Sequence, residues 1–268
     1  MASSMFPQLI MYPPPPLTSF TTAMALVNIV SMASLGISGI MGNNKQLQYS
    51  KFWNVGPKKS TPKLPGKLGM LLAYSPAFLC SLASFGIFPN DELRFVLLKL
   101  AVTIHFFKRL CEVLFVHKYS GPMFVDIATT ISLSYFVNTT FMIYAQHLTQ
   151  GLQEPPIDLK FVGIVIFLVG LSGNFYHHYL LSKLRGEGEK EYKVPRGGLF
   201  NLVICPHYLF EVVGFIGVSC IAQTFYAFSF TLGSAMLLMG RSYATRKWYL
   251  SKFEDFPKDV KAFIPFVF

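Results

Sequence analysis

Seven apolar segments recur along the chain, and most of its charged residues lie in the loops between them. Each segment has about 20 residues, the length that an α-helix needs to cross a hydrocarbon core of roughly 30 Å. A spanning helix satisfies its own backbone hydrogen bonds, as that core requires. We therefore expect an all-α, polytopic membrane protein, a bundle of seven transmembrane helices. The segments are Thr18–Met41, Leu68–Phe88, Phe95–Phe115, Met123–Tyr144, Phe161–Leu181, Leu199–Ala222 and Phe225–Gly240.

Composition agrees with a membrane protein, because 52% of the residues are hydrophobic and only 13% are charged. A soluble domain usually carries about 25% charged residues. The net charge of +10 does not indicate nucleic-acid binding, since the basic residues lie in separate loops rather than on one solvated face. The four cysteines lie within apolar runs and form no CxxC pair, so we expect neither a disulfide framework nor a metal site.

Loop charges predict the orientation. If the segments cross alternately, most Lys and Arg residues fall on one side, in the loop after Met41, in the 182–198 loop and in the tail after Gly240. By the positive-inside rule the N-terminus is lumenal and the C-terminus is cytosolic. We expect a Pro-rich N-terminal segment, residues 1–17, followed by a single seven-helix membrane domain, residues 18–268.

The third segment carries a polar cluster. His105, Lys108, Arg109 and Glu112 recur at i, i+3, i+4 and i+7, so they share one helix face. Glu112 can pair with Lys108 or with Arg109. The cluster is either a functional site or a salt-bridged helix end whose long side chains reach toward the cytosol.

The sixth segment carries a second cluster, within the run Pro206–Glu211. His207 and Glu211 are four residues apart and share a face, and Pro206 can bend the helix there. Ionisable side chains in hydrocarbon are costly, so they usually mark a functional site. The alternative is a structural pair between Glu211 and a basic loop residue.

The loop between the fifth and sixth segments contains several basic residues and glycines between Arg185 and Gly198. Such a loop suits a polyanionic ligand such as a nucleotide phosphate. Positive-inside topology would place basic residues there without any ligand. No GxGxxG motif follows a strand and the chain has no P-loop, so a dinucleotide would not be held by a Rossmann fold.

Five motifs follow one another in the second half of the chain: His105–Ser120, Gly173–Phe175, Tyr192–Gly198, Pro206–Glu211 and Tyr249–Phe268. Through them the chain, from about Leu100 to Phe268, resembles the steroid 5α-reductase superfamily. This superfamily includes very-long-chain enoyl-CoA reductases and polyprenol reductases. Residues 115–268 resemble the C-terminal domain of 3-oxo-5-alpha-steroid 4-dehydrogenases.

The resemblance implies a multi-pass protein of the endoplasmic reticulum membrane. Such proteins reduce a C=C bond conjugated to a carbonyl, with NADPH from the cytosolic side. The chain differs from the steroid reductases at His178, where they carry Asp, and at His207, where they often carry Asn. The resemblance assigns NADPH to Asn174, His178, Arg185, Tyr192, Lys193, Gly197, His207, Glu211 and Tyr249.

The resemblance also suggests catalytic residues. Steroid reductases resemble one another in a Glu–Tyr pair, and this chain has Tyr74 and Phe106 at those places. Enoyl-CoA reductases resemble one another in a Lys on the third helix and a Tyr on the sixth, which Lys108 and Tyr208 match. We therefore expect Tyr208 to donate the proton, with Lys108 favouring its phenolate.

The substrate class stays open between two lipids. The short N-terminus and the tail favour a 3-oxo-Δ4-steroid, whereas Lys108 and Tyr208 favour a trans-2-enoyl-CoA of very-long-chain fatty acid elongation. Seven helices with an external N-terminus would also describe a receptor. No DRY triplet follows the third segment and the seventh has no NPxxY, which disfavours a receptor. A transporter is also disfavoured, because the chain shows no inverted repeat.

Overall fold

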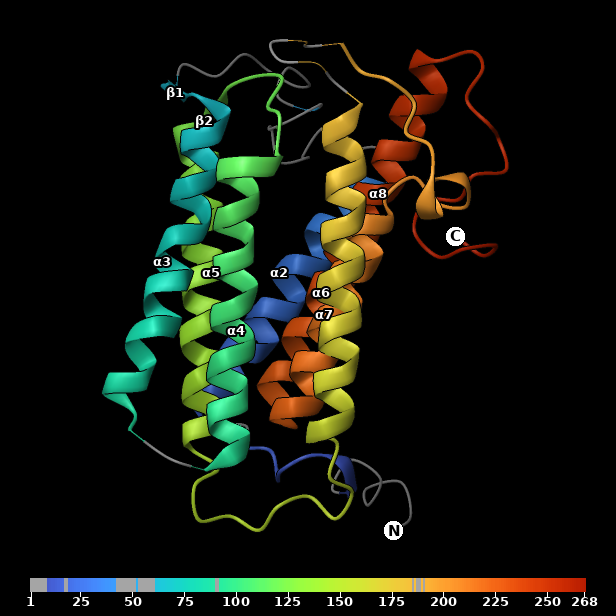
Figure 1. Cartoon of the computed structure of the whole chain (residues 1–268). Coiled ribbons are helices and arrows are strands. Elements are labelled where there is room, and N and C mark those ends of the chain that lie inside the picture. The colour runs from blue at the N-terminus through green and yellow to red at the C-terminus, as the bar shows by residue number, and fades with distance from the viewer. Residues whose placement is uncertain are drawn as a thin grey trace.

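The computed structural model of the chain describes residues 9–16, 19–41, 52, 61–89, 92–184, 186, 189 and 191–268. Within these residues the fold is all-α, with seven α-helices and one pair of two-residue strands (Figure 1). The helices are α2 (Phe20–Ile40), α3 (Gly66–Ile87), α4 (Leu93–Cys111), α5 (Val125–His147), α6 (Lys160–Lys183), α7 (Pro206–Ala222) and α8 (Phe225–Lys252).

One of these helices overlaps each predicted segment, so the predicted all-α fold with seven helices is confirmed. By length and composition, α2, α3 and α6 can each cross a membrane, and α7 is a shorter apolar helix of 17 residues. Many large apolar side chains face outward, among them Phe115 with 81% exposure. Exposed apolar surface on this scale suits contact with lipid rather than with water. The chain is therefore a multi-pass membrane protein.

The sixth and seventh segments differ from the prediction. The sixth was expected to be one helix from Leu199 with a bend at Pro206, and both expectations are wrong. A short 3-10 helix, η4 (Gly198–Asn201), is followed by non-helical residues, and α7 begins at Pro206. Proline suits the first helical position, because the N–H that it lacks would have no partner there. In the seventh segment, α8 continues to Lys252, well past the predicted end at Gly240.

Glycines allow two helix pairs to pack at close range. A Cβ at Gly170 of α6 would overlap the backbone of Gly214 in α7, and one at Gly163 would lie 2.7 Å from the carbonyl oxygen of Gly217. Small residues at such positions allow membrane helices to approach closely. The α2–α8 pair meets in the same way at Gly240, where a Cβ would overlap the backbone of Gly36.

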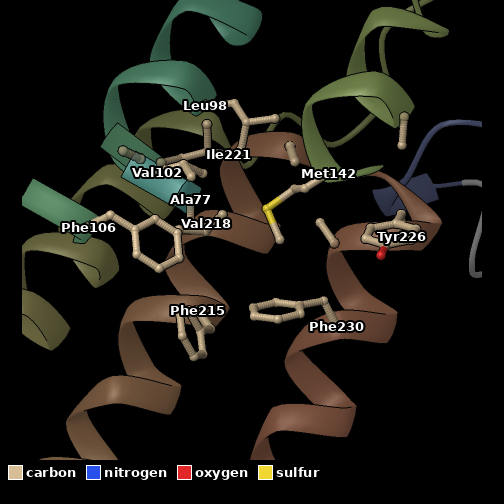
Figure 2. Close-up of a cluster of buried hydrophobic side chains, with 14 of the residues drawn as sticks. Ala77, Leu98, Val102, Phe106, Met142, Phe215, Val218, Ile221, Tyr226 and Phe230 are labelled. Atoms are coloured by element: carbon tan, nitrogen blue, oxygen red, sulfur yellow. The ribbon is translucent and has the colours of Figure 1, made fainter. Parts of the chain in front are cut away.

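Figure 1 shows α3, α4 and α5 on one side of the bundle and α6, α7 and α8 on the other, with α2 running obliquely between them. A shared apolar core joins the two sides (Figure 2). Phe106 of α4 and Met142 of α5 lie there with Phe215 of α7 and Phe230 of α8.

A polar network closes the end of the bundle where α4 begins. Arg94 is 2% exposed and donates to the carbonyl of Ile221, to Gln223 and to Asp158, at 2.9, 2.7 and 2.8 Å. Its Nη2 also lies 3.2 Å from the Glu154 carboxylate. This network ties α4 to the 148–159 loop and to the turn between α7 and α8.

The opposite end carries the strands and the C-terminal tail. Strand β1 (Lys63–Leu64) pairs antiparallel with β2 (Met123–Phe124). The tail lies beside the start of α7, because Ile204 N–H donates to the carbonyl of Lys261 at 2.9 Å. This end of the bundle also contains a cavity.

Candidate active site

A cavity of about 250 Å³ opens among α3, α4, α5, α6, α7 and α8 at the end of the bundle where α4 ends. Polar and aromatic side chains from all six helices reach its wall. The connecting residues 117–123 and 192–195 contribute as well. The wall includes Tyr74, Arg109, His117, His178, Tyr192, Lys193, His207, Tyr208, Glu211, Arg241 and Tyr249.

The cavity brings together most of the residues that the sequence singled out. Three of the predicted residues that the structure describes do not line the cavity: Lys108, Asn174 and Gly197. Arg185 lies outside the described residues. Gly197 has φ +84°, a conformation that favours glycine, and it leads into η4. The predicted residues on the wall are His178, Tyr192, Lys193, His207, Tyr208, Glu211 and Tyr249.

Glu112 is the centre of a buried ion-pair network. It is 1% exposed and begins a π-helical turn, η3 (Glu112–Val116), of a kind that is frequent at functional sites. Lys108 Nζ lies 2.8 Å from one carboxylate oxygen and Arg109 Nη1 lies 2.8 Å from the other. The predicted pairing of Glu112 is confirmed with both cations. His178 of α6 joins them, with Nδ1 at 3.0 Å from Oε1.

Asn174 links this network to the Pro206–Glu211 run. Its amide oxygen accepts a short hydrogen bond from Lys108. Its amide nitrogen donates to the carbonyl of His207 at 2.7 Å and lies 3.4 Å from the Glu211 carboxylate. The two polar clusters, on α4 and on α7, therefore form one network through α6.

Arg109 also holds a tyrosine on the cavity wall. Its Nη2 donates a short hydrogen bond to the hydroxyl of Tyr74, and its guanidinium lies 4.8 Å from the centre of that ring. Phe106 is the second residue that stands where the steroid reductases carry their Glu–Tyr pair. It lies in the core, with its ring centre 5.4 Å from that of Tyr135. Only Tyr74 of this pair therefore offers a hydroxyl to the cavity.

Tyr208 is held by a different cation from the one that the sequence suggested. Arg241 Nε donates to the Tyr208 hydroxyl at 3.1 Å, whereas Lys108 is bound by Glu112 and Asn174. Sequence reasoning missed Arg241 because it assigned this residue to the cytosolic tail. A signal was present, since no Gly or Pro separates Arg241 from Lys252 and nothing ends the helix between them.

The mouth of the cavity is aromatic and basic. The Tyr192 hydroxyl lies 2.8 Å from Ser120 Oγ, and its ring packs 5.0 Å from that of Trp248. The Tyr249 hydroxyl donates to the carbonyl of Lys193 at 3.4 Å. The Lys193 side chain is 47% exposed, and its ammonium lies 2.6 Å from the Glu189 carboxylate. A face of this kind suits phosphates and planar rings.

The ligand atoms of Glu112, His117 and His178 lie within 4.8 Å of one another, a spacing that a metal ion could bridge. Burial and the neighbouring His178 and Arg109 lower the pKa of His117 to about 2, so this imidazole is neutral at pH 7. Both oxygens of Glu112 already accept from cations. The group is therefore better described as an ion-pair network than as a metal centre.

Comparisons with known proteins identify relatives. The family model described as 3-oxo-5-alpha-steroid 4-dehydrogenase matches residues 123–268. A cotton (Gossypium hirsutum) steroid 5-alpha-reductase DET2 is 44% identical over 107 residues, which are 40% of this chain and 42% of the relative. A very-long-chain enoyl-CoA reductase of Dictyostelium discoideum is 29% identical over 75% of this chain and 72% of its own length.

A 3-oxo-5-alpha-steroid 4-dehydrogenase 2 of the rat (Rattus norvegicus) is 27% identical over 91% of this chain and 96% of its own length. By contrast, the match spans less than half the length of the cotton relative. The family model covers more than half of this chain, including Tyr192, Tyr208 and Arg241 of the cavity. The chain therefore belongs to the 3-oxo-5-alpha-steroid 4-dehydrogenase family, whose members are oxidoreductases that act on CH–CH groups.

Proposed function

We propose that this protein is an NADPH-dependent reductase of a C=C bond conjugated to a carbonyl in a membrane lipid, with a 3-oxo-Δ4-steroid as the substrate. One observation carries the proposal. A single cavity joins a tyrosine hydroxyl held by a buried arginine to an aromatic and basic mouth. Membership of an oxidoreductase family supports the same reaction class.

The reaction places three demands on the site. A hydride adds to the β-carbon, negative charge develops on the carbonyl oxygen, and a proton adds to the α-carbon. The protein must therefore offer one hydrogen-bond donor to the oxygen and one proton donor to the carbon. NADPH, when bound, supplies the hydride.

The cavity wall fits a nicotinamide dinucleotide. Lys193 offers a cation to phosphates, and Tyr192 and Tyr249 offer ring faces at the mouth. Glu211 also lines the wall. It is 7% exposed and lies beside the Asn174 amide, and this pair of groups could hydrogen-bond the carboxamide of nicotinamide. His178 and His207, which the family resemblance also assigns to NADPH, line the same wall.

Tyr208 is the proposed proton donor. Its oxygen accepts from the Arg241 guanidinium, and that positive charge stabilises the phenolate left when the proton moves to the α-carbon. Lys108 contributes indirectly, because it holds Asn174 in place beside Glu211.

Tyr74 is the proposed donor to the carbonyl oxygen. It lies on the cavity wall, and the short hydrogen bond from Arg109 polarises its hydroxyl. A hydroxyl that accepts from a cation donates more strongly to a second acceptor. Tyr74 would thus perform the task that a Glu–Tyr pair performs in the steroid reductases.

Charge distribution supports a cytosolic cavity. The cavity lies at the end of the bundle that holds the Lys193 segment and the basic tail, which the positive-inside rule places in the cytosol. We therefore propose a lumenal N-terminus, a cytosolic C-terminus and a location in the endoplasmic reticulum membrane. This orientation would give the site access to cytosolic NADPH.

The second candidate substrate is a long-chain trans-2-enoyl-CoA. The similarity to the Dictyostelium very-long-chain enoyl-CoA reductase covers 75% of this chain. By the family resemblance, Tyr208 corresponds to the tyrosine of that class. The family membership argues against a receptor.

A substrate panel tests the proposal. Membranes that contain the full chain are incubated with NADPH and with a 3-oxo-Δ4-steroid, or with a trans-2-enoyl-CoA of matched hydrophobicity. We expect NADPH consumption with the steroid and a product two mass units heavier by mass spectrometry. Reduction of the thioester alone would reassign the substrate. Reduction of neither compound, with the protein present at normal levels, would refute the proposed function.

A further inference from the structure

Arg241 is a buried cation on the cavity wall that the sequence had placed in the cytosolic tail. From its contacts we infer that Arg241 is the positioning residue of the proton donor. It orients the Tyr208 hydroxyl and stabilises the phenolate that forms there. The family resemblance had suggested this role for Lys108. This inference rests on the proposed function, since it concerns how that reaction obtains its proton.

The guanidinium of Arg241 is enclosed on two sides. Its Nε donates to the Tyr208 hydroxyl at 3.1 Å, and its Cζ lies 5.2 Å from the centre of the Phe52 ring. Arg241 is 6% exposed and Phe52 is 4% exposed, so bulk water has little access to the Arg241 guanidinium. A cation in such surroundings interacts with a developing negative charge far more strongly than it would in water.

The backbone around this pair is held firmly. Tyr208 lies in the first turn of α7 and Arg241 in the second half of α8, and a short turn at Gln223 and Thr224 connects the two helices. Gly240, directly before Arg241, packs against the backbone of Gly36 in α2. The position of the Arg241 backbone is therefore set by close helix packing, as positioning to a fraction of an ångström requires.

Lys108 is less suited to this task, because its ammonium is already engaged by two acceptors. It lies 2.8 Å from Glu112 and donates a short hydrogen bond to Asn174. To serve Tyr208 it would have to leave a buried carboxylate, which is costly. Arg241 makes its contact with Tyr208 directly.

The reduction requires one proton and one hydride. The O–H bond of Tyr208 breaks as a C–H bond forms at the α-carbon of the substrate, and the hydride from NADPH forms the C–H bond at the β-carbon. The phenolate that remains accepts a charge-assisted hydrogen bond from Arg241 Nε. A proton from water then restores the tyrosine. The substrate gains two hydrogens and NADPH is oxidised to NADP⁺.

A double-mutant cycle on the full chain tests the inference. Steady-state kcat and KM are measured for the wild type, Arg241→Ala, Tyr208→Phe and the double variant. We expect Arg241→Ala to lower kcat by about 10- to 100-fold, which is less than the full contribution of a general acid such as Tyr208. We expect little change in the KM for NADPH. We expect the double variant to be no slower than Tyr208→Phe alone, because residues that act as a unit are not additive.

Arg246 provides a matched control on the same helix. Its guanidinium donates to the carbonyls of Val260 and Lys258, both at 2.6 Å, and so anchors the tail. Any loss caused by Arg246→Ala should multiply with that of Tyr208→Phe. Quenching of tryptophan fluorescence by NADPH shows whether each variant is folded. If Arg241→Ala fails to fold, Arg241→Lys replaces it, with a smaller expected loss of kcat and the same lack of additivity.

Three results would overturn the inference. Losses from Arg241 and Tyr208 that multiply would mean that Arg241 does not act through Tyr208. A raised KM for NADPH at unchanged kcat would make Arg241 a cofactor contact. A wild type that reduces no substrate with NADPH would refute the proposed function, and this inference with it.

Discussion

Lys108 Nζ lies 2.8 Å from Oε1 of Glu112, one helical turn away on the same face. Glu112 also accepts from Arg109, and all three side chains are largely shielded from solvent. Arg109 and Lys108 in turn hold Tyr74 and Asn174, so the carboxylate organises two parts of the site at once. Its removal would leave these two cations without the carboxylate that binds them directly.

Glu112→Gln should therefore destabilise the protein strongly. Loss of one partner of a buried ion pair costs about 3–5 kcal/mol. The expected result is a large drop in Tm in detergent and little correctly folded protein in membranes. Glu254→Gln is the matched control, because Glu254 is exposed. Equal Tm values for the two variants would show that the Glu112 network does not hold the bundle together.

Much of the fold could be predicted from hydrophobic periodicity, because each helix needs about 20 apolar residues to cross a membrane. The helix boundaries near Pro206 and Gly240 could not be predicted in this way. Hydropathy does not show whether the apolar residues before Pro206 are helical or extended. It also does not show whether a helix continues into the polar residues after Gly240. At Pro206 the proline suits either a bend or a helix start, and the tail beside Ile204 supports the extended entry. Beyond Gly240, burial of Arg241 against Phe52 keeps a polar stretch inside the structure.

The site was predictable only in part. The contact between Lys108 and Glu112 is local, so helical spacing revealed it. The contacts of Asn174 with His207 and of Arg241 with Tyr208 join residues 33 positions apart on different helices. Such contacts depend on how the helices pack, which spacing along one segment does not determine.

Tyr208→Phe should abolish most of the reductase activity while the protein remains folded. It removes one hydroxyl and keeps the ring, so the expected loss in kcat is roughly 10²- to 10⁴-fold, the usual contribution of a general acid. Tyr226→Phe is the matched control, because the Tyr226 hydroxyl donates to Asn138 at 3.0 Å in the apolar core. Full activity in Tyr208→Phe would rule out Tyr208 as the proton donor.

Gly170→Leu should prevent the close packing of α6 against α7. Any Cβ at this position overlaps the backbone of Gly214, and backbone cannot move aside as a flexible side chain can. We expect loss of folded protein in membranes and of NADPH binding. Gly86→Leu is the control, because no heavy atom lies within 4 Å of a Cβ built on Gly86. Similar yields of the two variants would contradict the glycine-mediated packing.

Acid should weaken the end of the bundle that Arg94 closes. Partial burial raises the pKa of the Glu154 and Asp158 carboxyls, but hydrogen bonds from Lys160 and the charge of Arg94 outweigh it and hold each pKa below its ordinary value. A carboxyl with a lowered pKa stabilises the folded state above its ordinary pKa, 4.5 for Glu and 3.8 for Asp. That stability is lost as the pH falls through the lower, folded value.

The measurement is Tm in detergent between pH 7 and pH 3 for the wild type and for the double variant Glu154→Gln/Asp158→Asn. The wild type should lose stability below about pH 4.5 as both carboxyls gain protons. The variant should start with a lower Tm at pH 7 and fall less steeply, because it has no carboxyl at these two positions to protonate. Both carboxylates are partly exposed, so the difference should shrink at high salt. Parallel curves for the two proteins would show that this network contributes nothing to the acid sensitivity.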